Sequence, residues 1–128
     1  MIDLTALNGA RDSIYNDFQG VVLVNSSGTE VSDVVPTHSA TGFTPTYTWD
    51  RTTDGRIQLA QDIPFPVTEG TEVAGWRSKS GAYDDGIGEW TWDSTFIIGE
   101  DFNTPANFSY DGEFTLKATP TYIQISLV

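Results

Sequence analysis

The alternation of apolar and polar residues is clearest in the C-terminal part of the chain, residues 111–128. The apolar positions are Phe114, Leu116 and Ala118 before Pro120, and Ile123, Ile125 and Leu127 after it. A period of two residues is typical of a strand with one buried and one exposed face. We therefore predict two C-terminal strands that close a sheet, the last of them a central element of the fold.

Three earlier segments carry strand patterns of different kinds. Val21–Val24 is a continuous apolar run that ends in a polar turn cluster, which predicts a strand buried on both faces. Residues 46–61 alternate on either side of Asp54-Gly55 and predict a hairpin. Residues 63–67 contain two prolines, so we expect an edge strand or extended connector that buries Ile63, Phe65 and Val67.

The remaining segments are read as strands separated by long loops. We expect residues 29–45 to form a surface loop with a short edge strand, and residues 72–77 to form a strand. The composition of residues 78–89 and 99–112 favours two further loops. Between them, residues 90–98 predict a strand with the inward candidates Trp90, Trp92, Phe96 and Ile98.

Residues 3–18 are the one segment that predicts a helix. Asp3 can cap it, and Gly9 weakens its middle, so we expect one or two helical turns after residue 9 rather than one continuous helix. Its apolar side chains fall near one face: Leu4, Leu7, Ile14 and Phe18. Two interpretations stay open, a helix that plugs one end of a sandwich and a helix that docks onto a partner.

Together these elements predict a mainly β fold. We expect an antiparallel β-sandwich, jelly-roll-like, with a short N-terminal helix. With 128 residues, one domain is the natural expectation: residues 1–19 form a helical arm and residues 20–128 form the β core.

The charge of the chain narrows its partners. Six Lys and Arg residues against 18 Asp and Glu residues give a net charge of −12. This charge disfavours nucleic acid and anionic membrane surfaces as partners, because both repel an acidic protein. Cysteine is absent, and the sequence contains no apolar stretch near the ~20 residues of a membrane span and no signal-peptide pattern. We expect a soluble product that is made and kept inside the cell, or that leaves the cell by lysis.

Few residues suggest chemistry. His38 lies in a polar loop without the pattern of a catalytic triad, and the paired acids of the chain lie next to turns, where aspartate is common. Asp84–Glu89 offers oxygen atoms to Ca²⁺ but lacks the spacing of an EF-hand loop. We therefore predict no catalytic residue, cofactor or metal site, and leave calcium at that loop open.

Aromatic residues gather around the same acidic loop. Trp76, Tyr83 and Trp90 are candidate glycan contacts, because exposed aromatic rings on a β scaffold can stack on sugars. The alternative is that these rings belong to the core, which is the usual place for aromatic side chains of this size.

The order of the motifs resembles that of short virion proteins of tailed bacteriophages, described as head-decoration, minor tail or tail-fibre-like proteins. The similar features are an N-terminal helix, the strand and turn of residues 21–28, the Phe-Pro segment at 63–67, the strand at Glu72–Arg77 and the alternating C-terminal strands. The turn after Arg77 departs from the pattern, since its acidic, glycine-rich part comes later, at residues 84–88.

The resemblance implies a structural protein that is made in the host cytoplasm and lies on the virion surface, and it implies no catalytic residues. The expected partners are other virion proteins, either major capsid or tail subunits, and further copies of the chain in a homo-oligomer. A capsid decoration or minor capsid protein is the first expectation, with Leu4, Leu7, Ile14 and Phe18 as docking residues. A minor tail or fibre protein and a carbohydrate-binding module are the alternatives.

Overall fold

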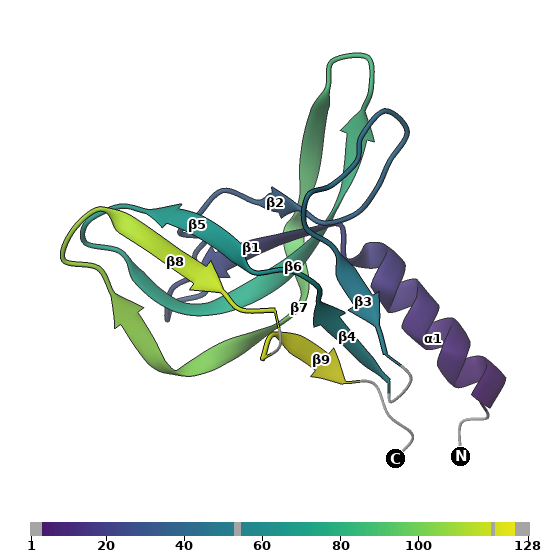
Figure 1. Ribbon diagram of the computed structural model, residues 1–128, viewed down its shortest axis with the longest axis horizontal. Coiled ribbons are helices and arrows are strands. Elements are labelled where there is room, and N and C mark those ends of the chain that lie inside the picture. The colour runs from purple at the N-terminus through teal and green to yellow at the C-terminus, as the bar shows by residue number, and fades with distance from the viewer. Residues whose placement is uncertain (1–3, 53–54, 119, 125–128) are drawn as a thin grey trace.

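The computed structural model describes residues 4–52, 55–118 and 120–124, with the side chains of residues 4–8 left out (Figure 1). The elements in chain order are α1 (Leu4–Asp17), β1 (Gly20–Val24), β2 (Val35–Pro36), β3 (Trp49–Arg51), β4 (Arg56–Leu59), β5 (Ile63–Val67), β6 (Glu72–Asp84), β7 (Glu89–Asn107), β8 (Gly112–Leu116) and β9 (Tyr122–Gln124).

The strands form antiparallel sheets of four, three and two strands, in the orders β2-β1-β6-β7, β3-β4-β9 and β5-β8. In Figure 1 the two smaller sheets lie toward opposite ends of the body, and α1 lies beside β3. The predicted mainly β, antiparallel, sandwich-like fold with an N-terminal helix is confirmed.

Two strands have the burial that their sequences predict. All five residues of β1 are buried, because β1 lies between β2 and β6 within its sheet. β5 alternates between buried and exposed residues, and its two prolines occupy the exposed positions. β5 pairs only with β8, so it is an edge strand in which the missing proline N–H groups cost least.

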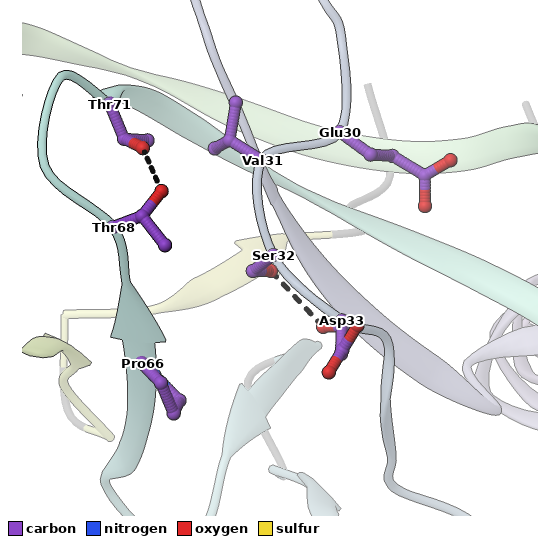
Figure 2. Close-up of a pocket in the computed structure, with 7 residues that line it drawn as sticks. All are labelled: Glu30, Val31, Ser32, Asp33, Pro66, Thr68 and Thr71. Carbon is purple, nitrogen blue, oxygen red and sulfur yellow. Dashed lines mark hydrogen bonds between the residues drawn. The ribbon is translucent and has the colours of Figure 1, made fainter.

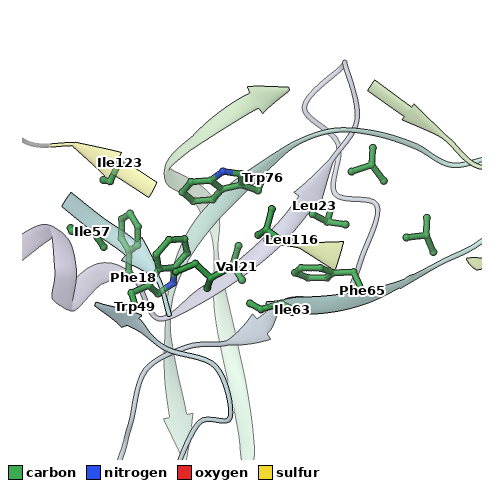
Figure 3. Close-up of a cluster of buried hydrophobic side chains, with 13 residues drawn as sticks. Phe18, Val21, Leu23, Trp49, Ile57, Ile63, Phe65, Trp76, Leu116 and Ile123 are labelled. Carbon is green, nitrogen blue, oxygen red and sulfur yellow. The ribbon is translucent and has the colours of Figure 1, made fainter. Parts of the chain in front are cut away.

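An aromatic trio joins the layers of the core (Figure 3). Phe18 follows α1, Trp49 starts β3 and Trp76 lies in β6, and each is at most 2% exposed. The Phe18 ring meets the Trp49 ring edge-on at 5.1 Å, and the Trp49 and Trp76 rings are 5.2 Å apart. Trp49 Nε1 donates to the Thr37 hydroxyl, which in turn donates to the Phe18 carbonyl, both at 3.1 Å.

The same packing includes two of the four predicted docking residues of the helix. Phe18 is buried in the core and Ile14 packs against it, so these side chains serve the fold. The side chains of Leu4 and Leu7 lie outside the described part of the chain. The helix was predicted either to cover one end of the β core or to dock onto a partner. The inward packing of Ile14 and Phe18 fits the first interpretation.

The helix is also more regular than the sequence predicts. α1 runs without a break from Leu4 to Asp17 and passes through Gly9. A glycine in a helix interior costs about 1 kcal/mol, which packing of one helix face can offset. Arg51 at the end of β3 adds an ion pair with Asp12 and lies over the Tyr15 ring at 4.7 Å.

The largest difference from the prediction is the length of the second hairpin. Residues 78–84 and 99–107, predicted as loops, are strand, and only residues 85–88 turn between β6 and β7. Glycine, aspartate and asparagine are depleted in strands and serine is common in turns, so the composition of these segments predicted loops. Here the small residues are needed because the strands bring bulky rings close to the backbone: a Cβ on Gly81 would lie 2.6 Å from Trp92.

The two C-terminal strands are also placed differently. β8 pairs with β5 and β9 pairs with β4, so they belong to different sheets, and β9 is an edge strand rather than a central one. Their alternation shows which residues share a face, but it carries no information about the partner strand. Ile125 and Leu127 lie outside the described residues.

Asp62 ties the segment between β8 and β9 to the segment between β4 and β5. Its carboxylate accepts a hydrogen bond of 2.8 Å from the Ala118 N–H and pairs with Lys117 at 3.5 Å. The Ala118 hydrogen bond has the largest effect and lowers the pKa of Asp62; burial opposes it, and the charge and hydrogen bond of Lys117 lower the pKa further.

A similar contact holds the turn after β1 and gives a pH-dependent prediction. The Ser26 hydroxyl and N–H both donate to Glu72 Oε1, and the hydroxyl has the larger effect in lowering the pKa of Glu72. Because the folded-state pKa is depressed, these bonds stabilise the fold above the ordinary glutamate range and are lost as the pH falls through the folded-state pKa. We expect Glu72→Gln to reduce the free energy of unfolding at neutral pH, with the difference from wild type shrinking between about pH 5 and pH 3.

Urea denaturation at several pH values measures this difference. Glu113→Gln, at an exposed position on β8, is the matched control and should leave the wild-type pH profile unchanged. A gap between wild type and Glu72→Gln that is equally large at pH 7 and pH 3 would contradict the ionic origin of the contact.

Candidate docking surface

β6 and β7 form a hairpin arm whose turn end projects from the body (Figure 1). Asp84 organises the turn: its carboxylate accepts from the Gly86 N–H at 2.9 Å, and its carbonyl accepts from the Gly88 N–H at 2.8 Å. Gly88 has φ of 73°, a conformation that glycine adopts without strain. The turn is thus built from local hydrogen bonds of its own acidic residue.

A cluster of four aromatic rings stiffens this arm. Trp90 and Trp92 stack in parallel with centroids 4.9 Å apart, and Tyr83 lies 5.5 Å from Trp90. Phe43, from the loop between β2 and β3, contacts Tyr83 at 5.1 Å and Trp90 at 5.5 Å. That loop rises beside the arm in Figure 1, so Phe43 fastens it there.

The pairing of β6 with β7 is interrupted by register shifts in the middle of the arm. At one of them, the Ser78 hydroxyl donates to the Ile98 carbonyl at 2.8 Å and accepts from the Ile98 N–H at 3.1 Å. Ser78 is fully buried, so a side chain takes the role of the backbone and keeps β7 continuous across the irregularity.

Next to this irregularity, β7 exposes consecutive apolar side chains. Phe96, Ile97 and Ile98 are 37%, 36% and 38% exposed. We call these residues the apolar triad. The register shift lies within the triad, since Ile97 and Ile98 both stand opposite Ser78, so the usual alternation of faces is interrupted and three consecutive apolar side chains are exposed together. Phe96 and Ile98 were predicted to point into the core, and their exposure corrects that prediction.

Acidic residues lie on both sides of the triad along β7: Glu89, Asp93, Glu100 and Asp101, with no Lys or Arg in the strand. The two basic residues of β6 are engaged with other groups. Arg77 pairs with Asp101 at 2.7 Å, and Lys79, 4% exposed, pairs with Glu30 at 3.1 Å. The edge of the arm therefore combines an apolar centre with acidic flanks.

A polar depression of about 490 Å³ lies elsewhere, between the segment after β1 and the end of β5 (Figure 2). Its lining carries the carboxylates of Glu30 and Asp33 and the hydroxyls of Ser32, Thr68 and Thr71. Several of these groups have partners within the protein: Glu30 pairs with Lys79, the Ser32 hydroxyl donates to the Asp33 carbonyl at 3.1 Å, and the Thr68 and Thr71 hydroxyls are 3.2 Å apart. The depression is open, and its lining shows no convergent set of groups for a ligand.

A smaller hollow of about 240 Å³ is more apolar. Phe102 of β7 stacks on Phe114 of β8 at 5.5 Å, and Trp76 and Leu116 complete the apolar part of the lining. This hollow lies where the four-stranded and two-stranded sheets meet, and it shows that apolar surface on β7 extends beyond the triad.

Two of the three predicted glycan contacts lie together, and the third does not join them. Trp76 is 1% exposed, and its Nε1 donates to Glu100 at 3.3 Å within the body of the protein. Tyr83 and Trp90 do meet on the arm, but they are half-buried and packed against each other and Phe43. The alternative that aromatic rings serve the core therefore applies to Trp76.

The other candidate groups also have structural roles in the part of the chain that is described. His38 meets the Tyr15 ring edge-on at 5.8 Å. In the Asp84–Glu89 turn, the Asp84 carboxylate is occupied by Gly86, and no group of three or more His, Cys, Asp or Glu residues suited to a metal ion is found among residues 4–52, 55–118 and 120–124. No described helix is long and apolar enough to cross a membrane.

The triad was not singled out from the sequence. Its signal is present in the chain as three consecutive large apolar residues between acidic residues, without a basic residue in the whole strand. Comparisons with family models, curated proteins and solved structures found no match for this chain.

Proposed function

We propose that the protein is a non-enzymatic structural protein of a bacteriophage virion, a capsid decoration or minor capsid protein that attaches to the particle surface. The observation that carries the proposal is the stiffened β6–β7 arm, in which the apolar triad of the edge strand β7 is exposed. Such a feature suits attachment to another protein, because exposed apolar surface is stabilised when a partner covers it.

The charge and the sequence layout support the same assignment. A net charge of −12 keeps many copies of a surface protein from associating with each other before they reach the particle. The order of helix, strands and turns resembles that of short virion proteins of tailed phages. A position on the phage head is the first proposal. A position in the tail or tail fibre is the alternative within the same class of virion proteins.

The contacts inside the protein favour the arm over the helix as the attachment element. Ile14 and Phe18 are committed to the core, whereas the triad is on the surface. The role first expected for the N-terminal helix is therefore assigned to β7.

Particles from a phage carrying the gene and from a deletion strain test the proposal. We expect the protein in purified wild-type virions, retention with heads after tails are removed, and a lower temperature of genome release from heads that lack it. Complementation with the wild-type gene controls for effects of the deletion itself. Particles of identical composition and stability with and without the gene would overturn the proposal, and retention with detached tails would move the protein to the tail.

A further inference from the structure

We propose that the outer edge of β7 around the apolar triad binds an extended segment of a partner protein whose apolar centre is flanked by lysine and arginine residues. The inference deepens the proposed function and rests on it for the setting in which the partner is met. It follows from the position of β7 in its sheet, from the triad and from the charges along the strand.

β7 is the last strand in the order β2-β1-β6-β7, and within the described ranges no strand lies on its outer side. An edge strand presents backbone N–H and C=O groups that can pair with a further strand. Strand addition of this kind provides affinity through the backbone and specificity through side chains on the two faces. The free edge of β7 gives an extended partner segment a place to bind.

The triad supplies the side-chain contacts. Phe96, Ile97 and Ile98 are each more than one-third exposed in the middle of β7. A strand surface in contact with water is normally polar, yet here three consecutive apolar side chains are exposed. An added strand with apolar residues opposite the triad would cover these side chains. The Lys79 ammonium lies over the Phe96 ring, 5.4 Å from its centre, and this cation–π contact restrains the ring.

The charges decide between a second copy and a different partner. Antiparallel pairing of two β7 strands centred on Ile97 would place Asp93 of one copy opposite Asp101 of the other, because both lie four residues from Ile97. Arg77 offsets part of the charge of Asp101, but the two chains would each bring a net charge of −12 to the contact. Parallel in-register pairing would place every acid opposite itself. Like charges directly opposite each other destabilise a sheet, whereas lysine or arginine at those positions would pair favourably.

The irregularities of β7 point the same way. Register shifts within the triad and just before it interrupt long, flat pairing of the kind that identical edges need to aggregate. A short partner segment with complementary charge needs only a short stretch of the edge. The edge is thus protected against copies of itself while its apolar centre stays accessible.

Two synthetic peptides test the proposal on the full chain. Both alternate valine and threonine, one with lysine pairs at its ends and the other with glutamate pairs. Fluorescence anisotropy of labelled peptide should show saturable binding of the lysine peptide only. We expect this binding to weaken about tenfold between ~0.05 M and ~0.5 M salt, because the charged flanks are exposed to solvent.

The variants Ile97→Asn and Ile87→Asn compare the contribution of the triad to peptide binding with that of the tip of the arm, and neither variant changes the charge of the protein. Ile87 lies in the turn and is 68% exposed, so its substitution should leave peptide binding unchanged. Ile97→Asn should weaken binding at least about tenfold. Near-UV circular dichroism of the stacked Trp90 and Trp92 checks that the arm is intact. If Ile97→Asn disturbs that signal, Glu89→Gln with Asp93→Asn tests the edge instead, and the loss of charge should reduce the salt dependence.

The outcomes distinguish this inference from the proposed function. Equal binding of both peptides, no binding of either, or no effect of an intact Ile97→Asn arm overturns the inference even if the protein is found in virions. Binding of the lysine peptide through Ile97 by a protein absent from virions supports the edge and overturns the virion role. Sedimentation that shows self-association through Ile97 at low salt would replace the basic partner with a second copy and also overturn the inference.

Discussion

Replacement of Trp76 by alanine is expected to lower the free energy of unfolding by about 3–5 kcal/mol. The side chain is 1% exposed and packs against Trp49 and, at 6.5 Å between ring centres, against Phe18. Its loss would leave a cavity where the end of α1, β3 and β6 meet. A small domain has only about 5–15 kcal/mol of stability, so this single change should bring the protein close to unfolding at ambient temperature.

Denaturant titrations of wild type, Trp76→Ala and Tyr110→Ala measure the effect. Tyr110 is the matched aromatic control because it is 80% exposed, and its loss should change stability by no more than about 0.5 kcal/mol. Trp76→Phe should fall between the two, since it keeps part of the packing and loses the hydrogen bond to Glu100. A cost below about 1 kcal/mol for Trp76→Ala would contradict the central place of the trio in the core.

The sequence predicted the fold class and the inward faces of several strands for a simple physical reason. Burial of β1 and the alternation in β5 are properties of the segments themselves, and apolar runs and period-two patterns record them directly. Residues 63–67 show this best, because the prolines that excluded a central strand also fixed which of their neighbours face the core. These parts of the prediction needed no knowledge of the partner strands.

The pairing partners of the strands and the length of the arm could not be predicted from the sequence, because they depend on contacts between residues far apart in the chain. β9 pairs with β4, more than 60 residues away, although β8 is its neighbour in the chain and has the same pattern. Gly81 was taken as a loop residue, but its role is to let Trp92 approach the backbone of β6. In the sequence alone, a glycine that is required for a close contact between strands cannot be distinguished from a glycine in a turn.

The candidate docking surface could not be predicted from the sequence for a related reason. Large apolar residues are normally buried, so Phe96 and Ile98 were expected in the core. Tyr83 and Trp90 were considered as glycan contacts, because exposed aromatic rings can stack on sugars. In the fold, the aromatic residues pack against each other to stiffen the arm, and the aliphatic residues beside a register shift are exposed. The side of a strand that a residue faces changes with each irregular step, and composition does not record those steps.

Gly99→Ala and Gly9→Ala are the same chemical change and should have opposite effects. A Cβ on Gly99 would lie 2.0 Å from the Trp76 carbonyl oxygen and 2.8 Å from the Arg77 Cα, so the backbones of β6 and β7 must move apart. We expect a loss of about 3 kcal/mol, at the upper end of the usual cost of overpacking, because backbone atoms cannot rotate out of the way. Gly9 lies in α1, and a Cβ added there would meet nothing within 4 Å, so alanine should stabilise the protein by about 0.5–1 kcal/mol.

The opposite signs make this pair a test of the arm itself. Denaturant midpoints should fall for Gly99→Ala and rise for Gly9→Ala, and near-UV circular dichroism should change only for Gly99→Ala. Because Gly99 follows the apolar triad directly, its substitution should also weaken binding of the lysine peptide, while Gly9→Ala should leave binding intact. If Gly99→Ala were as stable as wild type, this would contradict the close approach of β6 and β7 at Gly99. The exposure of the apolar triad depends on the same strand pairing, so that result would contradict it as well.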